Sequence, residues 1–186
     1  MKQISKRARV LTGGAALVAL GAGAFGAVSA NAATPAAAPA AAVAKADAKK
    51  KDTTSRTHLT IDAATKAAQA ALDAAEKENQ RVSVAVVDRN GNTLVTLRGD
   101  GAGPQSYESA EKKAYTAVSW NAPTTELVKR LEQAPNLKDI PGTLFLGGGA
   151  PVTAKNAPIA GIGVAGAPSG DLDQKFAQAG VDALAK

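Results

Sequence analysis

The chain has 186 residues, of which 22 are basic and 16 acidic, and it contains no cysteine, one histidine and one methionine. The lack of cysteine excludes disulfides, thiolate metal sites and cysteine nucleophiles. A single histidine argues against a multi-histidine metal centre and against a Ser-His-Asp hydrolase.

Residues 1–32 have the pattern of a secretory signal peptide. A basic start precedes an apolar run over residues 10–30, and Ala-Asn-Ala at residues 30–32 is a small-x-small cleavage site. Residues 5–11 resemble a twin-arginine signal in which lysine replaces the first arginine, so the export route, Sec or twin-arginine, stays open. A membrane anchor is the alternative, but glycine and alanine dominate the run. We therefore expect a secreted, extracellular protein.

The net charge lies mostly outside the expected domain. Residues 33–56 are rich in Ala, Pro, Lys and Thr and predict a disordered tether, because they offer little apolar surface to bury. Residues 57–186 then suit a single domain with 13 basic and 14 acidic residues. A nearly neutral domain gives no support to nucleic-acid binding. The Lys49-Lys50-Lys51 run in the tether could associate with anionic polymers of the cell surface, although a solvated charge run is the simpler interpretation.

The first half of the domain predicts a helix and a β-hairpin. Thr60 can cap a helix that ends near Asn79, with an apolar stripe formed by residues 61, 64, 68, 71, 72 and 75. Residues 82–87 and 93–98 predict two antiparallel strands. The Asn90-Gly91 pair between them suits the positive φ angles of a tight turn.

The second half predicts further helices and short strands. Ser106 can cap a helix to Trp120, and Thr125 can cap a short helix to Ala134. Strands are expected at residues 144–146, 152–154 and 159–165, and Ser169 can cap a closing helix. No lysine follows the glycine run at residues 147–149, so the run predicts a turn with positive φ at its second or third glycine and not a phosphate loop. The element order predicts an α+β domain with a mostly antiparallel sheet.

The ordered motifs resemble the GlcG/HbpS-like family of haem-binding domains. They are Leu-Thr-Ile-Asp-Ala-Ala at 59–64, Val-Ala-Val-Val-Asp at 84–88 with Asn-Gly after it, Gly-Gly-Ala-Pro-Val at 148–152 and Ile-Gly-Val-Ala-Gly at 162–166. The resemblance covers residues 59–186. It implies a five-stranded, mostly antiparallel sheet flanked by helices, assembly into an octamer, and binding of haem and iron outside the cell. It also implies signalling to the extracellular domain of a sensor histidine kinase.

Removal of the signal peptide limits the residues that can serve as an axial ligand of haem. Haem iron takes His, Cys, Met or Tyr as axial ligands, which leaves His58, Tyr107, Tyr115 or an oxygen ligand. The resemblance implies Thr143, whose hydroxyl is a hard, weak ligand that favours ferric iron. The alternative for Thr143 is a β-branched residue that starts a strand. His58 is the second candidate.

Two carboxylates form a candidate iron site. Glu108 and Glu111 lie three residues apart, share one helix face and can chelate a hard cation; the resemblance supports an iron site here. The alternative is a solvated face on which Glu108 pairs with Lys112. Lys113 is a candidate partner for a haem propionate.

Three functions are compatible with these residues. The first is a non-enzymatic haem and iron sensor for redox or haem stress that acts through the kinase partner. The second is a haem-degrading enzyme, for which no residue that delivers electrons or acts on the distal side can be named. The third is an oligomeric binding module for another small ligand.

Overall fold

The computed structural model describes residues 47–185, so the predicted signal peptide and the first part of the tether lie outside the described residues. Among the helices described, none is long and apolar enough to cross a membrane. The main elements are, in chain order, α1 (Ile61–Glu76), β1 (Ser83–Asp88), β2 (Thr93–Arg98), α2 (Pro104–Trp120), α3 (Thr124–Lys129), β3 (Gly149–Ala154), β4 (Ala157–Ala165) and α4 (Gly170–Asp182). Short 3-10 helices are η1 (Lys50–Asp52), η2 (Arg130–Glu132) and η3 (Pro135–Asp139).

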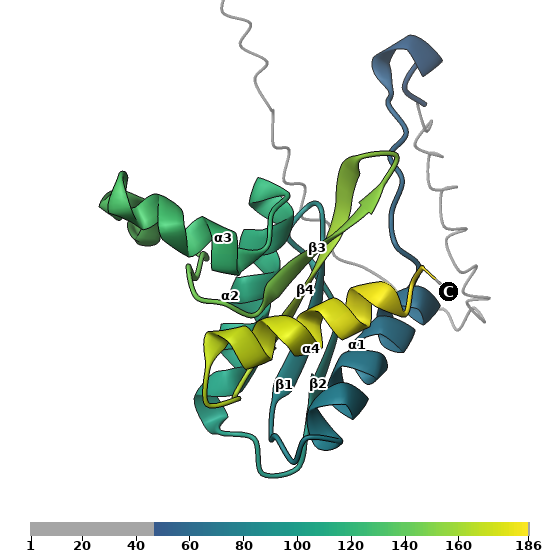
Figure 1. Ribbon diagram of the computed structural model, residues 1–186. Coiled ribbons are helices and arrows are strands. Elements are labelled where there is room, and N and C mark those ends of the chain that lie inside the picture. Colours follow the sequence, from purple (N-terminus) through teal and green to yellow (C-terminus); the bar gives the residue numbers. More distant parts are fainter. Residues whose placement is uncertain (1–46, 186) are drawn as a thin grey trace, which may run out of the picture. The chain divides into compact units, whose positions relative to one another are not determined.

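The strands form one antiparallel sheet with helices on both faces. The strand order is β2-β1-β4-β3, and each neighbouring pair is antiparallel. Helix α2 covers one face, while α1 and α4 lie side by side on the other (Figure 1). This arrangement confirms the predicted α+β class.

The central strand β1 carries the core on both faces. All six of its residues are buried, because neighbouring strands pair with both of its edges and helices cover both faces. Val84 and Val86 pack into the cluster formed with α1 and α4, whereas Ala85 and Val87 pack against alanines of α2. This alternation follows from the two-residue period of a strand.

Helix α2 lies directly on β4 because the facing residues are small. A Cβ atom at Gly161 would collide with the carbonyl of Ala114, and one at Gly163 with the carbonyl of Ala110. The two glycines in β4 therefore allow the backbone of α2 to come within van der Waals contact of the sheet. This contact fixes the distance between α2 and the sheet, and α2 carries the predicted site residues Glu108, Glu111 and Lys113.

Two of the predicted helix caps are confirmed. The hydroxyl of Thr60 accepts a hydrogen bond from the amide of Ala63 at 3.2 Å, and that of Ser169 accepts one from Leu172 at 3.2 Å. One residue of the predicted apolar stripe departs from it: Ile61, the first residue of α1, is 56% exposed.

The other two predicted caps are wrong. Helix α2 begins at Pro104, two residues before Ser106, because proline at the first position gives up no helical hydrogen bond. The hydroxyl of Ser106 is instead buried and lies 2.8 Å from that of Ser83. Helix α3 begins at Thr124, and Thr125 does not cap it.

The expected strand at residues 144–146 is absent from the described sheet, which therefore has four strands and not five. The amide of Leu144 donates to the side chain of Thr116, so this segment hydrogen-bonds to a helix in place of a strand. The glycine run consequently leads into β3 and does not connect two strands. Gly148 has the predicted positive φ, at 122°, while Gly149 is the first residue of β3.

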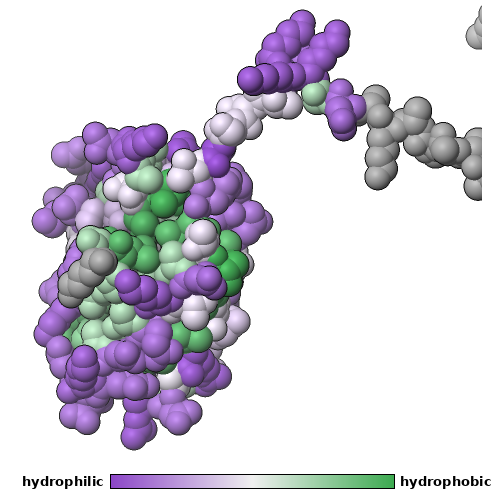
Figure 2. All heavy atoms as spheres, turned by 90° about the vertical axis from the view of Figure 1, so that its right-hand side faces the viewer, coloured by the Kyte–Doolittle hydropathy of each residue, from purple (hydrophilic) through white to green (hydrophobic). Residues whose placement is uncertain are grey.

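One face of the domain exposes apolar side chains. Figure 2 looks onto the side where α1 and the C-terminal end of α4 lie, and hydrophobic residues gather there inside a ring of hydrophilic ones. Ile61 at the start of α1 is the exposed large hydrophobic residue of that helix. Exposed apolar patches of this kind are typical of association surfaces.

Candidate functional site

Thr143 lies in an irregular segment between η3 and β3. Its side-chain hydroxyl donates a hydrogen bond to the carbonyl of Ile140 at 2.7 Å, and the residue is 9% exposed. A threonine hydroxyl has one proton to donate and two lone pairs. The bond to Ile140 therefore orients the oxygen and leaves its lone pairs free to accept a bond or to bind a metal.

Helix α2 anchors the residues that follow Thr143. The hydroxyl of Thr116, which is fully buried, accepts a hydrogen bond from the amide of Leu144 at 2.8 Å. Phe145 packs edge-on against Trp120, with the ring centroids 5.2 Å apart. These two contacts hold the backbone of Thr143 against α2.

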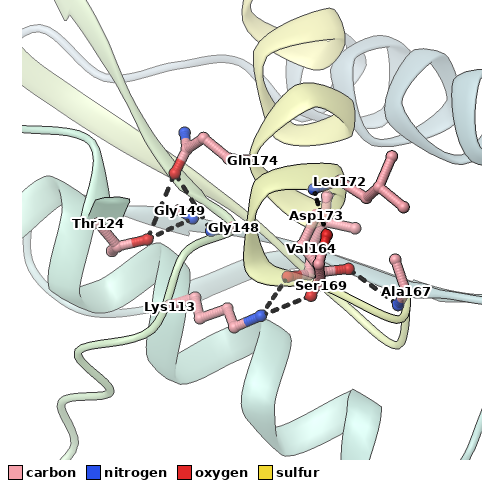
Figure 3. Close-up of polar contacts among 10 residues, drawn as sticks. All are labelled: Lys113, Thr124, Gly148, Gly149, Val164, Ala167, Ser169, Leu172, Asp173 and Gln174. Atoms are coloured by element: carbon pink, nitrogen blue, oxygen red, sulfur yellow. Dashed lines mark hydrogen bonds and ion pairs between the residues drawn. The ribbon is translucent and has the colours of Figure 1, made fainter. Parts of the chain in front are cut away.

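A buried polar network holds the other end of the segment (Figure 3). The hydroxyl of Thr124 accepts from the amide of Gly149 at 2.8 Å, and the side-chain oxygen of Gln174 accepts from the amide of Gly148 at 3.1 Å. A Cβ at Gly148 would come within 2.9 Å of the ammonium of Lys113. The chain between Thr143 and β3 is thus fixed by α2, α3 and α4 together.

Lys113 belongs to this buried polar network. Its ammonium donates to the carboxylate of Asp173 at 2.7 Å and to the carbonyl of Val164 at 3.0 Å, and both charged side chains are 5% exposed. Burial raises the pKa of Asp173, and the charge of Lys113 offsets part of that rise. The ammonium of Lys113 is thus buried and engaged within the protein, and its contact with a haem propionate stays a prediction.

A pocket with a volume of about 430 Å³ lies between α2, the β1–β2 hairpin and the residues just before Thr143. Gly142, the residue before Thr143, lines this α2 pocket. Tyr115 lies between two glycines in it, since a Cβ at Gly91 would be 3.0 Å from the ring and one at Gly142 would be 3.7 Å from it. The residues that line the α2 pocket are Val87, Gly91, Thr93, Glu111, Lys112, Tyr115, Pro141 and Gly142.

The two candidate iron ligands differ in their surroundings. Glu111 lines the α2 pocket and accepts a hydrogen bond from the hydroxyl of Thr96 at 3.2 Å. Glu108 is exposed and lies 2.6 Å from the ammonium of Lys112, which holds its pKa below the usual range through a hydrogen bond and its charge. Residues 47–185 contain no group of three or more His, Asp or Glu placed to hold a metal, so a cation at this pair would need water ligands as well.

His58 lies apart from Thr143. It is exposed in the residues before α1, and its charge helps to lower the pKa of Asp88 at the end of β1. Burial pushes that pKa upward, but hydrogen bonds from Asn92 and Asn90 outweigh it. In the described part of the chain, no hydrogen bond or ion pair joins His58 to Thr143.

Sequence reasoning missed the residues that position Thr143. The sequence analysis gave no such role to Thr116, Thr124 or Gln174, although their side chains accept hydrogen bonds from the amides of Leu144, Gly149 and Gly148. A weak signal existed for Thr116, since a hydroxyl on the buried face of an alanine-rich helix must find a partner.

Comparison with known proteins identifies the family. The family model for the haem degrading protein HbpS-like family matches residues 59–182. The chain belongs to the HbpS-like family. A crystal structure of a double mutant of Streptomyces reticuli HbpS is 73% identical, has a TM-score of 0.75, and covers 76% of this chain and 97% of its own. A second structure of HbpS is 75% identical, with a TM-score of 0.73, and covers 74% and 97% of the two chains.

More distant relatives share the same domain. A 15.0 kDa protein of Citrobacter freundii, from the dhaT-dhaS intergenic region, is 32% identical over 133 residues, which are 69% of this chain and 93% of the relative. The crystal structure of a PduOC:heme complex is 28% identical, has a TM-score of 0.63, and covers 68% of this chain and 95% of its own.

Proposed function

We propose that this protein binds haem and iron outside the cell and acts as a redox or haem-stress sensor or as an accessory to a two-component sensor kinase. The high identity to HbpS and the haem complex of the related PduOC support haem as the ligand. The observation that carries the proposal in this chain is the position of Thr143: its hydroxyl is oriented by Ile140, and it directly follows Gly142, which lines the α2 pocket.

Two exposed apolar residues near Thr143 in the sequence support a porphyrin ligand. Ile140 is 40% exposed and Leu146 is 54% exposed, so apolar side chains flank the hydroxyl in the sequence. Haem combines a large apolar ring with a metal, and apolar side chains with one oriented donor meet both requirements. Thr143 would supply the oxygen ligand, which a ferric iron accepts and from which haem can exchange.

Titration with hemin, followed through the Soret band, tests this function. A saturable shift at one hemin for each chain is the expected result. His58→Ala should keep the shift, because His58 lies in the segment before α1 and, among the described residues, no hydrogen bond or ion pair joins it to Thr143. Loss of the shift in His58→Ala alone would move the axial ligand from Thr143 to the histidine.

Glu108 and Glu111 are the proposed iron ligands. One of the HbpS structures is a double mutant in which two glutamates three positions apart are replaced by aspartate. In this chain only Glu108 and Glu111 have that spacing. Glu111 also lines the α2 pocket, so iron held here would lie on the same side of α2 as the proposed haem ligand.

Haem degradation is the second candidate function, because the matching family is described as haem degrading. The test is to add ascorbate in air to the haem complex and to follow the Soret band. A sensor keeps the band, apart from the shift on reduction. Progressive loss of the Soret band together with release of iron would show that the protein degrades haem. That result would favour the enzyme over the sensor.

The remaining parts of the proposal concern assembly, partner and location. The apolar face over α1 and α4 supports a homo-oligomer, which we propose to be an octamer; light scattering after size-exclusion chromatography measures its mass. Binding to the extracellular domain of the sensor kinase, compared with and without hemin, tests the signalling role.

N-terminal sequencing of the protein from culture medium tests cleavage after residue 32. The basic run of the tether remains the proposed contact with the cell surface.

A further inference from the structure

A second pocket lies between the segment before α1 and the β3–β4 hairpin. It has a volume of about 370 Å³ and is distinct from the α2 pocket, with which it shares no lining residue. Pockets of roughly 300–1,000 Å³ are the usual size for small ligands. In Figure 1 the extended chain that enters α1 passes the tip of the β3–β4 hairpin. The residues that line this basic pocket are Arg56, Thr57, Arg89, Ala154, Lys155, Ala157, Pro158 and Ile159.

The basic pocket is positively charged, whereas the domain as a whole is nearly neutral. Three of its lining residues, Arg56, Arg89 and Lys155, are basic and none is acidic, although the residues from 57 onward are nearly neutral. Within the described residues, none of the three forms an ion pair. Like charges that gather in one concave site, with no acidic partner, raise the local concentration of anions.

The nearest acidic residue in the sequence does not neutralise this charge fully. Asp88 precedes Arg89, but its carboxylate accepts hydrogen bonds from the amides of Asn90 and Asn92 at 2.8 and 2.9 Å. The side-chain amide of Asn92 also donates to both of its oxygens. Asp88 is thus committed to the β1–β2 turn and is not among the residues that line the basic pocket.

The backbone positions two of the cations. The amide of Arg89 donates to the carbonyl of Ile159 at 3.1 Å, and its guanidinium donates to the carbonyl of Pro158 at 3.3 Å. These bonds hold the guanidinium beside the start of β4 and leave its other N–H groups free for a ligand. Lys155 lies in the two-residue turn of the hairpin, where its φ of 50° and that of Asn156, 62°, fix the direction of the chain.

We propose that the basic pocket binds a small multivalent oxyanion, with Arg89 as the main contact and Lys155 and Arg56 as further positive charges. A guanidinium fork matches the two oxygens of a phosphate or a carboxylate group. Phosphate and carboxylate ligands share this chemistry. The nearly neutral charge of the domain as a whole favours a small anion over a nucleic acid.

Calorimetric titration of the purified protein with pyrophosphate and, separately, with citrate tests the proposal. We expect saturable binding of at least one of them, weakened about tenfold by Arg89→Ala or by Lys155→Ala; tenfold corresponds to about 1.4 kcal/mol, near the lower end for a hydrogen bond to a charged group. Tighter binding of pyrophosphate would assign the site to phosphate compounds, and tighter binding of citrate to carboxylates. Arg130→Ala, which removes an exposed arginine that does not line the basic pocket, should leave both affinities unchanged.

The proposal is overturned if neither anion gives saturable heat at millimolar concentration, or if Arg130→Ala weakens binding as much as Arg89→Ala does. Arg89→Lys keeps the charge but removes the fork, and it should bind with intermediate affinity. Circular dichroism checks that each variant is folded. The hemin titration of the same variants separates this site from the haem site, because Arg89→Ala should leave the Soret shift intact.

Discussion

The ammonium of Lys113 in α2 lies 2.7 Å from the carboxylate of Asp173 in α4, and both side chains are buried. The pair spans the sheet from one helical layer to the other, past the end of β4, where the carbonyl of Val164 accepts a second bond from Lys113. The second carboxylate oxygen of Asp173 accepts a hydrogen bond from the amide of Ala167, just before α4. One ion pair therefore joins α2, β4 and the start of α4.

Removal of one partner of this pair should destabilise the fold strongly. We expect Lys113→Met to lower the free energy of unfolding by about 3–5 kcal/mol, because it leaves the buried charge of Asp173 unpaired. Urea denaturation measures the change. In the control, Lys175→Met breaks the exposed pair with Glu78 and should cost at most about 1 kcal/mol.

The double variant Lys113→Met with Asp173→Leu tests whether the unpaired charge of Asp173 causes the loss of stability. If the unpaired charge is responsible, the double variant should be more stable than Lys113→Met alone. A double variant as unstable as the sum of the two single changes would mean that the loss comes from packing.

Thr116 should act on haem through Thr143. Thr116→Val keeps the shape of the side chain but leaves the amide of Leu144 without its acceptor, at a cost of about 1–3 kcal/mol. We expect weaker hemin binding and a changed Soret maximum, because the backbone next to Thr143 is no longer held. Absorbance titration measures both quantities.

Thr116→Ser provides the matched control, since it restores the hydroxyl. It should recover the wild-type Soret maximum even if it remains less stable. A Soret maximum and hemin affinity that do not change in a folded Thr116→Val protein would contradict the positioning role.

Asp88 should make stability depend on pH in the acid range. Its pKa in the folded protein lies below the ordinary value of 3.8, because its hydrogen bonds to Asn92 and Asn90 outweigh the effect of burial. Its contribution to stability is therefore complete above that value and is lost as the pH falls through the lowered pKa. We expect the difference in melting temperature between wild type and Asp88→Asn to be largest near neutral pH and to shrink below about pH 4.

The comparison with Asp88→Asn is needed because Asp173 acts in the opposite sense. Its pKa is raised by burial, so its contribution is complete at low pH and is lost as the pH rises through the raised value. Asp173 is present in both proteins and cancels in the difference. A difference that stays constant between pH 7 and pH 3 would contradict the assignment to Asp88.

Iron binding should depend on both carboxylates on α2. We expect Glu108→Gln or Glu111→Gln to weaken ferric iron binding about tenfold or more, because each removes a charged oxygen ligand. Glu126→Gln in α3 is the control and should have no effect. Equal loss in Glu126→Gln would mean that iron binds through general surface charge.

The sequence predicted the elements whose signals are local. The hairpin followed from Asn90-Gly91 between two β-branched runs, and the caps Thr60 and Ser169 followed from hydroxyls that precede apolar periodicity. The strand expected at residues 144–146 failed because its β propensity was overridden by contacts from distant residues, above all Thr116.

The candidate site was predicted only in part, because some of its contacts join residues that are far apart in the sequence. The spacing of Glu108 and Glu111 on one helix face could be read from the sequence, as could the alternative pair of Glu108 with Lys112, which the structure confirms. The burial of Lys113 could not be read, because its partner Asp173 is 60 residues away in the chain. The α2 pocket likewise needs residues from β1, the β1–β2 turn, α2 and the segment before β3.

The most direct test of the haem proposal is a hemin titration of wild type, Thr143→Ala and Thr153→Ala, followed through the Soret band. Thr153 is an exposed threonine in β3 and serves as the matched control. The account predicts a saturable shift in wild type and Thr153→Ala that is lost or strongly weakened in folded Thr143→Ala. No saturable shift in wild type, or an unchanged shift in Thr143→Ala, would contradict it.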